Sequence, residues 1–371
     1  MGARREYTEN WQLIQATDER AKVLVVQELL KSYFYYRMLE ANNVINIYDT
    51  LEVPMYIAPP ALGKWFDKGD FLPDHQTTAA AMGYWTNRYC VFPSGYDVLE
   101  MMQKEGDPQQ LFDLSELRAA ELAWAIRRTL ASAVFNGTGG KQPDGLATII
   151  EKLAPGAQVV VVGGIDKATK AWFRNKFVQL TANFGSIAAG TTLPAGLLAA
   201  MQLKDQCTNG TLVPSDLVTG KAVFDMFRRA MLEISTPYHM ISERKTAEYG
   251  HKNFMFDGAY MGWDPNCPAD TIYALHLEDK FDPDKTGDPR DKAKLDRDLE
   301  DIGVKSPFQL KGSLGISMHP KIKMRKIAPR SPYRQLSETE WTITSFNLHV
   351  NRMADQGVAG SDNGSRWSTW S

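Results

Sequence analysis

This sequence has few cysteines, no long apolar run and no apolar signal segment among its first residues. Its 371 residues include three cysteines, Cys90, Cys207 and Cys267, and their spacing fits neither a disulfide framework nor a CxxC site. No apolar run approaches the roughly 18 residues that a bilayer span requires. The N-terminal residues lead into polar ones rather than into an apolar signal segment. We therefore expect a protein from a reducing cytoplasm that has no membrane partner.

An excess of positive charge is also lacking. The chain has 42 Lys and Arg against 44 Asp and Glu, which gives a formal net charge of −2. Domains that grip nucleic-acid phosphates usually carry a marked basic excess. This balance argues against a dedicated nucleic-acid-binding protein, but it is compatible with a wall that surrounds nucleic acid.

Motifs for catalysis are incomplete. A phosphate-binding loop at Gly139-Gly-Lys-Gln would need glycine where Phe135 stands and Ser or Thr where Gln142 stands. The VVVVGG run at 159–164 resembles the first strand of a nucleotide fold, but a dinucleotide fingerprint requires three glycines in register and only the adjacent Gly163 and Gly164 are present. The six histidines are scattered, with no pair at metal-ligand spacing. We expect no catalytic site, no cofactor and no metal, and a chain built for contacts.

The first 50 residues are expected to form an arm. Residues 18–40 place apolar side chains close to the i, i+3, i+4, i+7 spacing of an amphipathic helix. Such a helix packs either on its own domain or on a neighbouring subunit, and the sequence leaves both alternatives open.

Residues 51–100 are expected to form an extended loop. Prolines favour extended chain over residues 53–60, and an aromatic stretch over residues 84–92 is typical of a strand. We predict two strands around a bend between Lys64 and Pro73. Two isolated strands are only marginally stable in water. The aromatic side chains of this segment therefore need a surface that nearby sequence does not supply; they are Trp65, Phe66, Phe71, Tyr84 and Trp85. We expect the three at the bend, Trp65, Phe66 and Phe71, to make intersubunit contacts.

The strongest helix prediction covers residues 113–136. Asp113 and Glu116 have the spacing of a capping box, and Asn136-Gly137 is typical of a helix end. About 22 residues at 1.5 Å each give a rod of roughly 33 Å, which is long for a compact domain. One stripe of this helix is expected to comprise Leu117, Trp124, Ala131 and Val134, with Ala120 and Arg127 near it.

An alternating pattern of strands and helices follows. Asp257-Gly258 predicts a two-residue hairpin. Residues 279–301 hold nine acids and six bases and predict a solvated insertion. We predict strands at 159–162, 216–219, 253–256, 259–263 and 271–276, and helices at 168–180, 193–204 and 221–233.

The chain closes with a long predicted strand at 338–352. Its apolar positions change face near Ser345, which indicates a bulge or a crossing between two packing environments. The tail from Gly357 to Ser371 is rich in Gly, Ser and Asp, and we expect its end to be poorly ordered.

The succession of these elements resembles the major capsid proteins of tailed bacteriophages, of the Hong Kong 97 type, a fold shared with encapsulin shells. LAWAIRRTLASAVFNG at 122–137 and PDGLATII at 143–150 are similar to the spine helix of that family and the turn after it. GIDKATKAWFRN at 164–175 resembles a segment that enters the axial domain. The later strand and helix segments resemble the rest of that domain and the return to the peripheral domain; they are residues 215–219, 254–264, 270–275 and 330–335.

This resemblance implies an α+β capsid fold of the Hong Kong 97 type. Its parts would be an N-terminal arm (1–50), an extended β-hairpin loop (51–100), a peripheral domain with a long spine helix (101–155 and 321–371) and a mixed α/β axial domain (156–320). It implies a non-enzymatic major capsid protein that forms hexamers and pentamers of an icosahedral head around double-stranded DNA. The location would be the virion, assembled in the host bacterial cytoplasm.

The resemblance also implies partners. The chain would contact copies of itself, a portal, a separate scaffold protein and packaged DNA, the last without sequence preference. Two alternatives stay open: an encapsulin-type compartment loaded with cargo enzyme, and a cytoplasmic α/β enzyme whose site assembles from distant residues.

Overall fold

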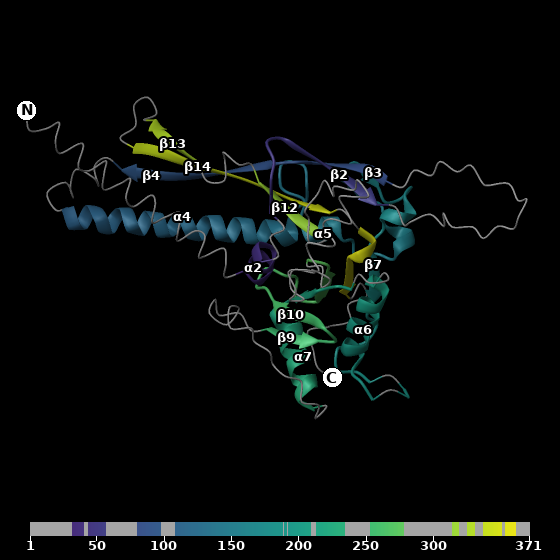
Figure 1. Cartoon of the computed structure of the whole chain (residues 1–371). Helices are drawn as coiled ribbons and strands as arrows, with labels where there is room; N and C mark the ends of the chain where they lie inside the picture. Colours follow the sequence, from purple (N-terminus) through teal and green to yellow (C-terminus); the bar gives the residue numbers. More distant parts are fainter. Residues whose placement is uncertain are drawn as a thin grey trace, which may run out of the picture.

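A long helix and two sheets form the framework of the molecule (Figure 1). α4 (Pro108–Asn136) runs alongside a five-stranded sheet, and a six-stranded sheet lies on its other side with α6 (Ala195–Cys207) and α7 (Lys221–Glu233). The fold is mixed α+β. The computed structural model describes residues 32–40, 44–56, 80–97, 108–187, 189–190, 192–208, 213–233, 253–277, 314–318, 325–330, 337–350 and 353–360.

α4 is 29 residues long, or about 44 Å at 1.5 Å per residue. It begins at Pro108, so the capping-box start predicted at Asp113 was wrong. Proline suits the first helical turn, where its missing N–H would have no partner within the helix. The predicted end is confirmed, because the helix stops at Asn136 and the N–H of Gly137 donates to the Ala133 carbonyl at 2.9 Å.

The buried face of α4 differs from the predicted stripe. Ala131 and Val134 are buried as expected, whereas Leu117 is 57% and Trp124 is 58% exposed. Leu117, Trp124 and Ala131 are seven residues apart, and positions at this spacing drift by about 20° per heptad around a straight helix. The residues at the two ends of such a stripe therefore do not all face one core. The side chains that α4 gives to the core at intervals of three and four are Ala123, Ile126, Leu130 and Val134.

The six-stranded sheet is buried on both faces. Leu217, Ile272 and Ala359 pack in one core with α6 and α7. The alternate positions, such as Val218 and Tyr273, pack in the larger core that contains α2 and α4. The strand order is β7 (Lys176–Gln179), β15 (Gly357–Gly360), β11 (Thr271–Leu275), β8 (Asp216–Thr219), β10 (Ala259–Trp263) and β9 (Asn253–Phe256).

Most of this unit agrees with the sequence predictions. β8, β9, β10 and α7 have the predicted bounds, and α6 and β11 differ at their ends. The predicted hairpin between β9 and β10 is confirmed: Asp257 and Gly258 have φ values of 47° and 77°, the left-handed conformations that a tight two-residue turn requires. The predicted solvated insertion at 279–301 lies outside the described residues.

The segment predicted as a helix at 168–180 folds differently. It contains a 3-10 turn, η2 (Ala171–Phe173), followed by β7. The Arg174 guanidinium donates to the carbonyls of Lys167 and Ala168 at 2.8 and 2.7 Å, which a helix would have used for its own backbone bonds. The helix prediction was wrong because this local alternative and the pairing of β7 with β15 outweigh helical periodicity.

The apolar strand predicted at 159–162 was also only partly correct. β5 (Val161–Val162) pairs with β6 (Ile165–Asp166) in a small separate hairpin. Gly163 and Gly164 make its turn with positive φ values of 57° and 78°. Val159 and Val161 are exposed, so this strand does not enter a buried sheet.

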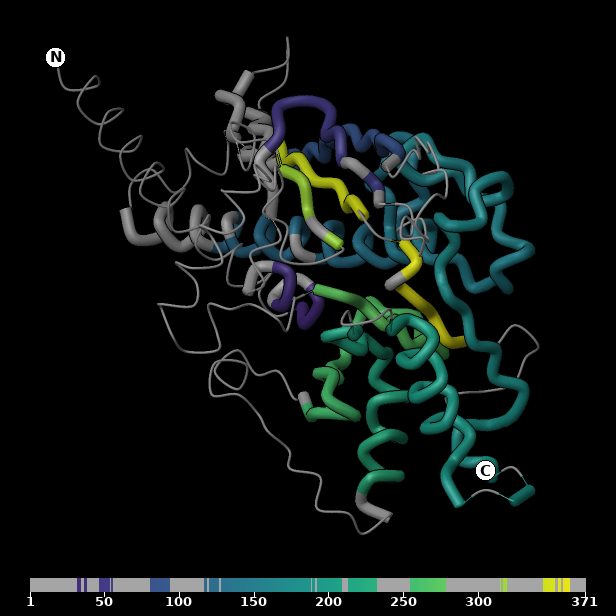
Figure 2. The backbone as a smooth tube through the Cα atoms, turned by 45° about the vertical axis from the view of Figure 1, so that its right-hand side comes forward, coloured from purple at the N-terminus to yellow at the C-terminus, as the bar shows by residue number. Residues whose placement is uncertain are grey.

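β14 (Ser337–Val350) changes partners along its length. Ser337 to Phe346 pair with β4 (Arg88–Asp97), and β13 (Arg325–Arg330) pairs with part of the same stretch on β14. Residues 347–350 pair with β12 (Leu314–Met318), which pairs in turn with β1 (Val44–Asn46). The change of partner after Phe346 confirms the predicted crossing near Ser345. From there the chain descends through η3 (Met353–Asp355) to β15, in yellow in Figure 2.

The described part of the N-terminal helix, α2 (Tyr33–Glu40), packs on its own chain. The Arg37 Nε lies 2.7 Å from the Asp216 Oδ1, and both side chains are buried. The Ser32 hydroxyl donates to the Asp264 Oδ2 at 2.6 Å. Of the two alternatives for this helix, the structure supports packing on its own domain for residues 33–40; residues 18–31 lie outside the described chain.

Candidate functional site

The two strands predicted for the extended loop are paired in the structure. β2 (Thr50–Tyr56) and β3 (Ala80–Thr86) run antiparallel, with Thr50 opposite Thr86 and Tyr56 opposite Ala80. The candidate contact residues Trp65, Phe66 and Phe71 belong to the sequence between these strands and lie outside the described residues.

The base of this hairpin is fixed to the body by Trp85. Its ring is buried between two glycines: a Cβ on Gly83 would lie 2.5 Å from the ring, and one on Gly163 would lie 2.6 Å from it. The N–H of Tyr84 donates to the Gly163 carbonyl at 2.9 Å, which joins β3 to the β5–β6 turn. Trp85 was expected to need a surface that nearby sequence does not supply, and the structure provides it from a distant part of the same chain, at Gly163.

The other face of the same strands is exposed and carries apolar side chains together with Glu52, which lies opposite Tyr84. Tyr84 is 52% exposed. The alternation of exposed and buried side chains along β3 continues in β4 after a break at the buried Asn87. Contiguous exposed apolar side chains typically mark sites of protein contact. The exposed side chains along β3 and β4 are Met82, Tyr84, Tyr89 and Val91.

Two buried asparagines hold the junction of β3 and β4. The Asn347 amide donates to the Thr86 carbonyl at 2.9 Å and accepts from the N–H of Asp144 at 2.9 Å. The Asn87 amide donates to the Ile47 carbonyl at 3.0 Å, and its oxygen accepts from the Ser317 hydroxyl at 3.2 Å. These bonds position the loop strands against β14 and β12, so the hairpin emerges in a defined direction.

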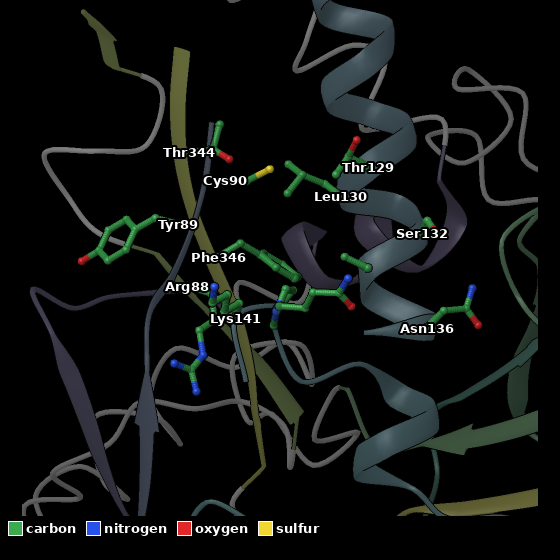
Figure 3. Close-up of a pocket in the computed structure, with 13 residues that line it drawn as sticks. Arg88, Tyr89, Cys90, Thr129, Leu130, Ser132, Asn136, Lys141, Thr344 and Phe346 are labelled. Carbon is green, nitrogen blue, oxygen red and sulfur yellow. The ribbon is translucent and has the colours of Figure 1, made fainter. Parts of the chain in front are cut away.

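A groove of about 400 Å³ lies between α4 and the paired strands β4 and β14 (Figure 3). Cys90 of β4 and Leu130 of α4 point toward each other across it, whereas Tyr89 points away from the helix. Its full lining is Arg88, Tyr89, Cys90, Thr129, Leu130, Ser132, Ala133, Asn136, Lys141, Gln142, Pro143, Thr344 and Phe346.

The lining of the groove offers little for acid–base chemistry. Its lining residues include no histidine and no carboxylate that could serve as a general base. Burial raises the pKa of the Cys90 thiol, which keeps it protonated and poorly nucleophilic at neutral pH. Within the described residues, no three His, Cys, Asp or Glu side chains gather as metal ligands. No helix among those residues is long and apolar enough to span a membrane.

Two buried titratable residues lie elsewhere in the body. His349 on β14 is fully buried, neither ring nitrogen has a hydrogen-bond partner, and desolvation lowers its pKa to about 3. Lys167 is also buried, and desolvation lowers the pKa of its amine to about 8 against the opposing effect of Glu151.

The comparisons with known proteins identify the fold. No family model and no curated protein matches the sequence. The structure is similar to the cyanophage A-1(L) capsid subunit, with 13% identity, a TM-score of 0.53, and coverage of 89% of this chain and 93% of that one. The chain shares the capsid fold. The capsid of an empty GTA particle is similar to the same degree, with 13% identity, a TM-score of 0.52, and coverage of 87% and 95%.

An encapsulin has the same fold. The SrpI encapsulin of Synechococcus elongatus is 11% identical, with a TM-score of 0.50 and coverage of 89% of each chain. The predicted resemblance to phage capsid proteins and the α+β class are thus confirmed at the level of the fold. The sequence did not identify the groove or the seat of Trp85, although Gly83 and Gly163 were visible signals of close approach to a large side chain.

Proposed function

We propose that this chain is the major capsid protein of a tailed bacteriophage, a structural subunit of an icosahedral head. The observation that supports this is the extent of the fold match. Two capsid proteins match 87–89% of this chain and are themselves covered to 93–95%, so the capsid fold accounts for nearly all of both chains. The subunit would form hexamers and pentamers around double-stranded DNA.

The proposal divides the chain as in capsid proteins of the Hong Kong 97 type. Residues 1–50 would form the arm, 51–100 the extended loop, 101–155 and 321–371 the peripheral domain, and 156–320 the axial domain. α4 is then the spine helix. β15 returns from the C-terminal region into the six-stranded sheet and pairs with β7 and β11, which ties the two domains together.

Within this proposal the loop aromatics (Trp65, Phe66 and Phe71) contact a neighbouring subunit. The paired strands β2 and β3 support this, because they form a two-stranded unit whose exposed face already carries Met82 and Tyr84. One face of this unit is already buried in the core of its own chain, through Leu51, Val53, Met55 and Trp85. Each large apolar side chain that stays exposed would gain about 1.5–3 kcal/mol on burial, and a partner surface would provide that gain.

The remaining partners follow from the same proposal. They are other copies of the chain, a portal and a separate scaffold protein. DNA would be contacted without sequence preference, since the net charge of −2 offers no basic excess. The location is the virion, after assembly in the host bacterial cytoplasm, and no cofactor takes part.

The encapsulin match supports a second candidate, a compartment shell loaded with protein cargo. The contents of isolated shells separate the two candidates. Shells from the native source would be treated with nuclease and opened: protected double-stranded DNA supports the phage head, whereas a co-packaged enzyme supports the compartment. A chain that forms only a small oligomer, with or without a scaffold partner, would contradict both.

A further inference from the structure

The short helix α2 lies between the long helix α4 and the six-stranded sheet, and it contacts both (Figures 1 and 2). It belongs to the region assigned to the arm, and the proposed contacts between subunits do not involve it. The side chains that it buries almost completely are Tyr33, Phe34, Arg37 and Met38. A helix of eight residues is marginal in water by itself, so its position depends on what it packs against.

The sheet contacts α2 along one face of β10. The Arg37 guanidinium lies over the ring of Tyr260, 4.8 Å from the ring centroid. Two residues further on, Gly262 leaves room for the Tyr33 ring, because a Cβ at this position would lie 2.2 Å from that ring. Alternate residues of a strand share one face of the sheet. The helix therefore follows β10 at close range, and the strand has a glycine where the approach is tightest.

Two buried aspartates bind α2 at separate points. Asp264 directly follows β10, and its Oδ2 accepts the Ser32 hydroxyl at 2.6 Å and the Phe34 N–H at 3.4 Å. These bonds fix the start of the helix. Asp216 begins β8, and its two oxygens accept the Arg37 Nε at 2.7 Å and the Arg37 Nη2 at 3.4 Å. Such a two-pronged pair restricts direction as well as distance.

The separation of the two aspartates determines the direction of α2. Asp216 is paired in register with Tyr260. Asp264 lies four residues beyond Tyr260, which is roughly 13 Å along the strand at 3.3 Å per residue. A helix bound at one point can rotate about that point, whereas a helix bound at two points keeps one direction.

The opposite side of α2 meets the long helix. The ring of Phe34 lies 5.7 Å from that of Phe135 on α4, measured between centroids, with 61° between the ring planes. The Phe135 ring also lies 6.3 Å from the ring of Tyr273 on β11. Packed interiors have few voids and resist gradual deformation. The direction of α2 therefore determines how α4 and the sheet pack against each other.

We propose that α2 sets the angle between α4 and the six-stranded sheet, and that the buried Arg37–Asp216 pair specifies that angle. The desolvation of two buried charges offsets much of their attraction, so the pair contributes little net stability, but it tolerates fewer arrangements than apolar contact does. In the proposed shell, where α4 and the sheet belong to the peripheral and axial domains, a single angle gives subunits of one shape and particles of one diameter. This consequence for the shell rests on the proposed function, whereas the angle itself does not.

Distances between spin labels on the unassembled full chain test the angle. Glu121→Cys on α4 and Arg228→Cys on α7 place the labels at exposed positions, in a parent chain that also carries Cys90→Ser. Replacing the ion pair by apolar side chains, with Arg37→Met and Asp216→Leu together, should leave the melting temperature of the parent chain unchanged or raise it. Pulsed electron paramagnetic resonance should nevertheless show a broad or shifted distance distribution where the parent chain has one narrow peak.

A matched control removes an ion pair made by α6, which packs on the opposite face of the sheet. Lys204→Met together with Asp257→Asn should keep the narrow peak. Arg37→Lys is a milder variant that keeps the charge but loses the planar fork and the stacking on Tyr260. Its distribution should lie between the other two, and it decides the test if the apolar pair fails to fold. Distances like those of the parent chain in every folded variant of the Arg37–Asp216 pair would overturn the proposal.

Electron micrographs of assembled particles test the consequence for the shell. The wild-type chain and the control should form particles of one diameter, whereas the apolar pair should form several diameters or open sheets. A single diameter from a variant with a broad distance distribution would refute the link between the angle and the shell. A wild-type chain that forms no shells contradicts the proposed function instead, and the label distances still decide whether α2 sets the angle.

Discussion

His349 should make the stability of the subunit depend on pH. The ring is fully buried on β14, where it lies roughly perpendicular to the Trp85 ring with 6.4 Å between ring centroids, and its two nitrogens have no hydrogen-bond partner. Desolvation lowers its pKa to about 3 in the folded chain, against an ordinary value of 6.5. Between these two pH values the unfolded chain binds a proton that the folded chain does not.

The sign and size follow from this difference. The stabilising contribution is fully present above pH 6.5 and is lost as the pH falls toward 3, at up to about 1.4 kcal/mol per pH unit. Between pH 7 and pH 5 the free energy of unfolding should fall by about 2 kcal/mol through this residue alone. Replacing His349 with Leu removes the titration and two unsatisfied nitrogens, so the variant should lose about 2 kcal/mol less over the same interval.

Urea unfolding of the unassembled subunit, followed by circular dichroism at pH 5, 7 and 8, measures both chains. Carboxylates titrate alike in the two, so the difference between the chains isolates His349. At pH 8 the histidine is neutral in both states, and the comparison there reports the packing effect of the substitution. Equal pH dependence in the wild type and in His349→Leu would refute the reasoning.

Four further outcomes are expected. Replacing the loop aromatics with Ser should leave the melting temperature of the free subunit near normal while shell assembly fails; a strongly destabilised monomer would mean that they pack within their own chain. Asp216→Ala should lower the free energy of unfolding by about 3–5 kcal/mol, because Arg37 is left buried without its carboxylate, and a loss below 1 kcal/mol in urea titrations would contradict this. Gly163→Ala should cost about 1–3 kcal/mol from its positive φ alone, with more from the clash with Trp85, whereas the control Gly156→Ala has open space and should be nearly silent in the same melts. The free subunit should bind duplex DNA weakly at physiological salt, and a submicromolar Kd in a fluorescence titration would rule out this account of its charge.

Local signals predicted the parts of the fold that depend on short-range structure. α7, β8, β9 and β10 have their predicted bounds because amphipathic periodicity, β-branched residues and the Asp257-Gly258 turn all favour the same local structure. The change of partner along β14 was visible as a change in the face that its apolar residues occupy.

The sequence predictions failed where contacts between residues far apart in the sequence determine the local structure. Residues 168–180 have helical spacing, yet the Asn175 side chain bonds to the backbone of Glu151 and β7 pairs with a strand near residue 358, and neither partner is visible locally. β15 itself lies in a Gly-rich tail where we expected poor order at the end, and it is a buried interior strand of the six-stranded sheet. Small residues there let α6 approach closely: a Cβ on Gly357 would lie 2.5 Å from the Cys207 sulfur.

The candidate contact surface was predicted in outline. The paired loop strands were expected, but which aromatic residues face the body depends on glycines far apart in the sequence, as Trp85 and Gly163 illustrate. Exposure of Trp124 on α4 was not predicted, because an apolar stripe in a sequence does not reveal whether a core or a partner covers it.

Negative-stain electron microscopy of the chain, expressed alone and together with a candidate scaffold protein, tests the central claim most directly. The account predicts closed icosahedral shells, or rings of five and six subunits that convert into shells when the two proteins are mixed. A homogeneous monomer or small oligomer under both conditions, across a wide range of concentrations, would contradict it.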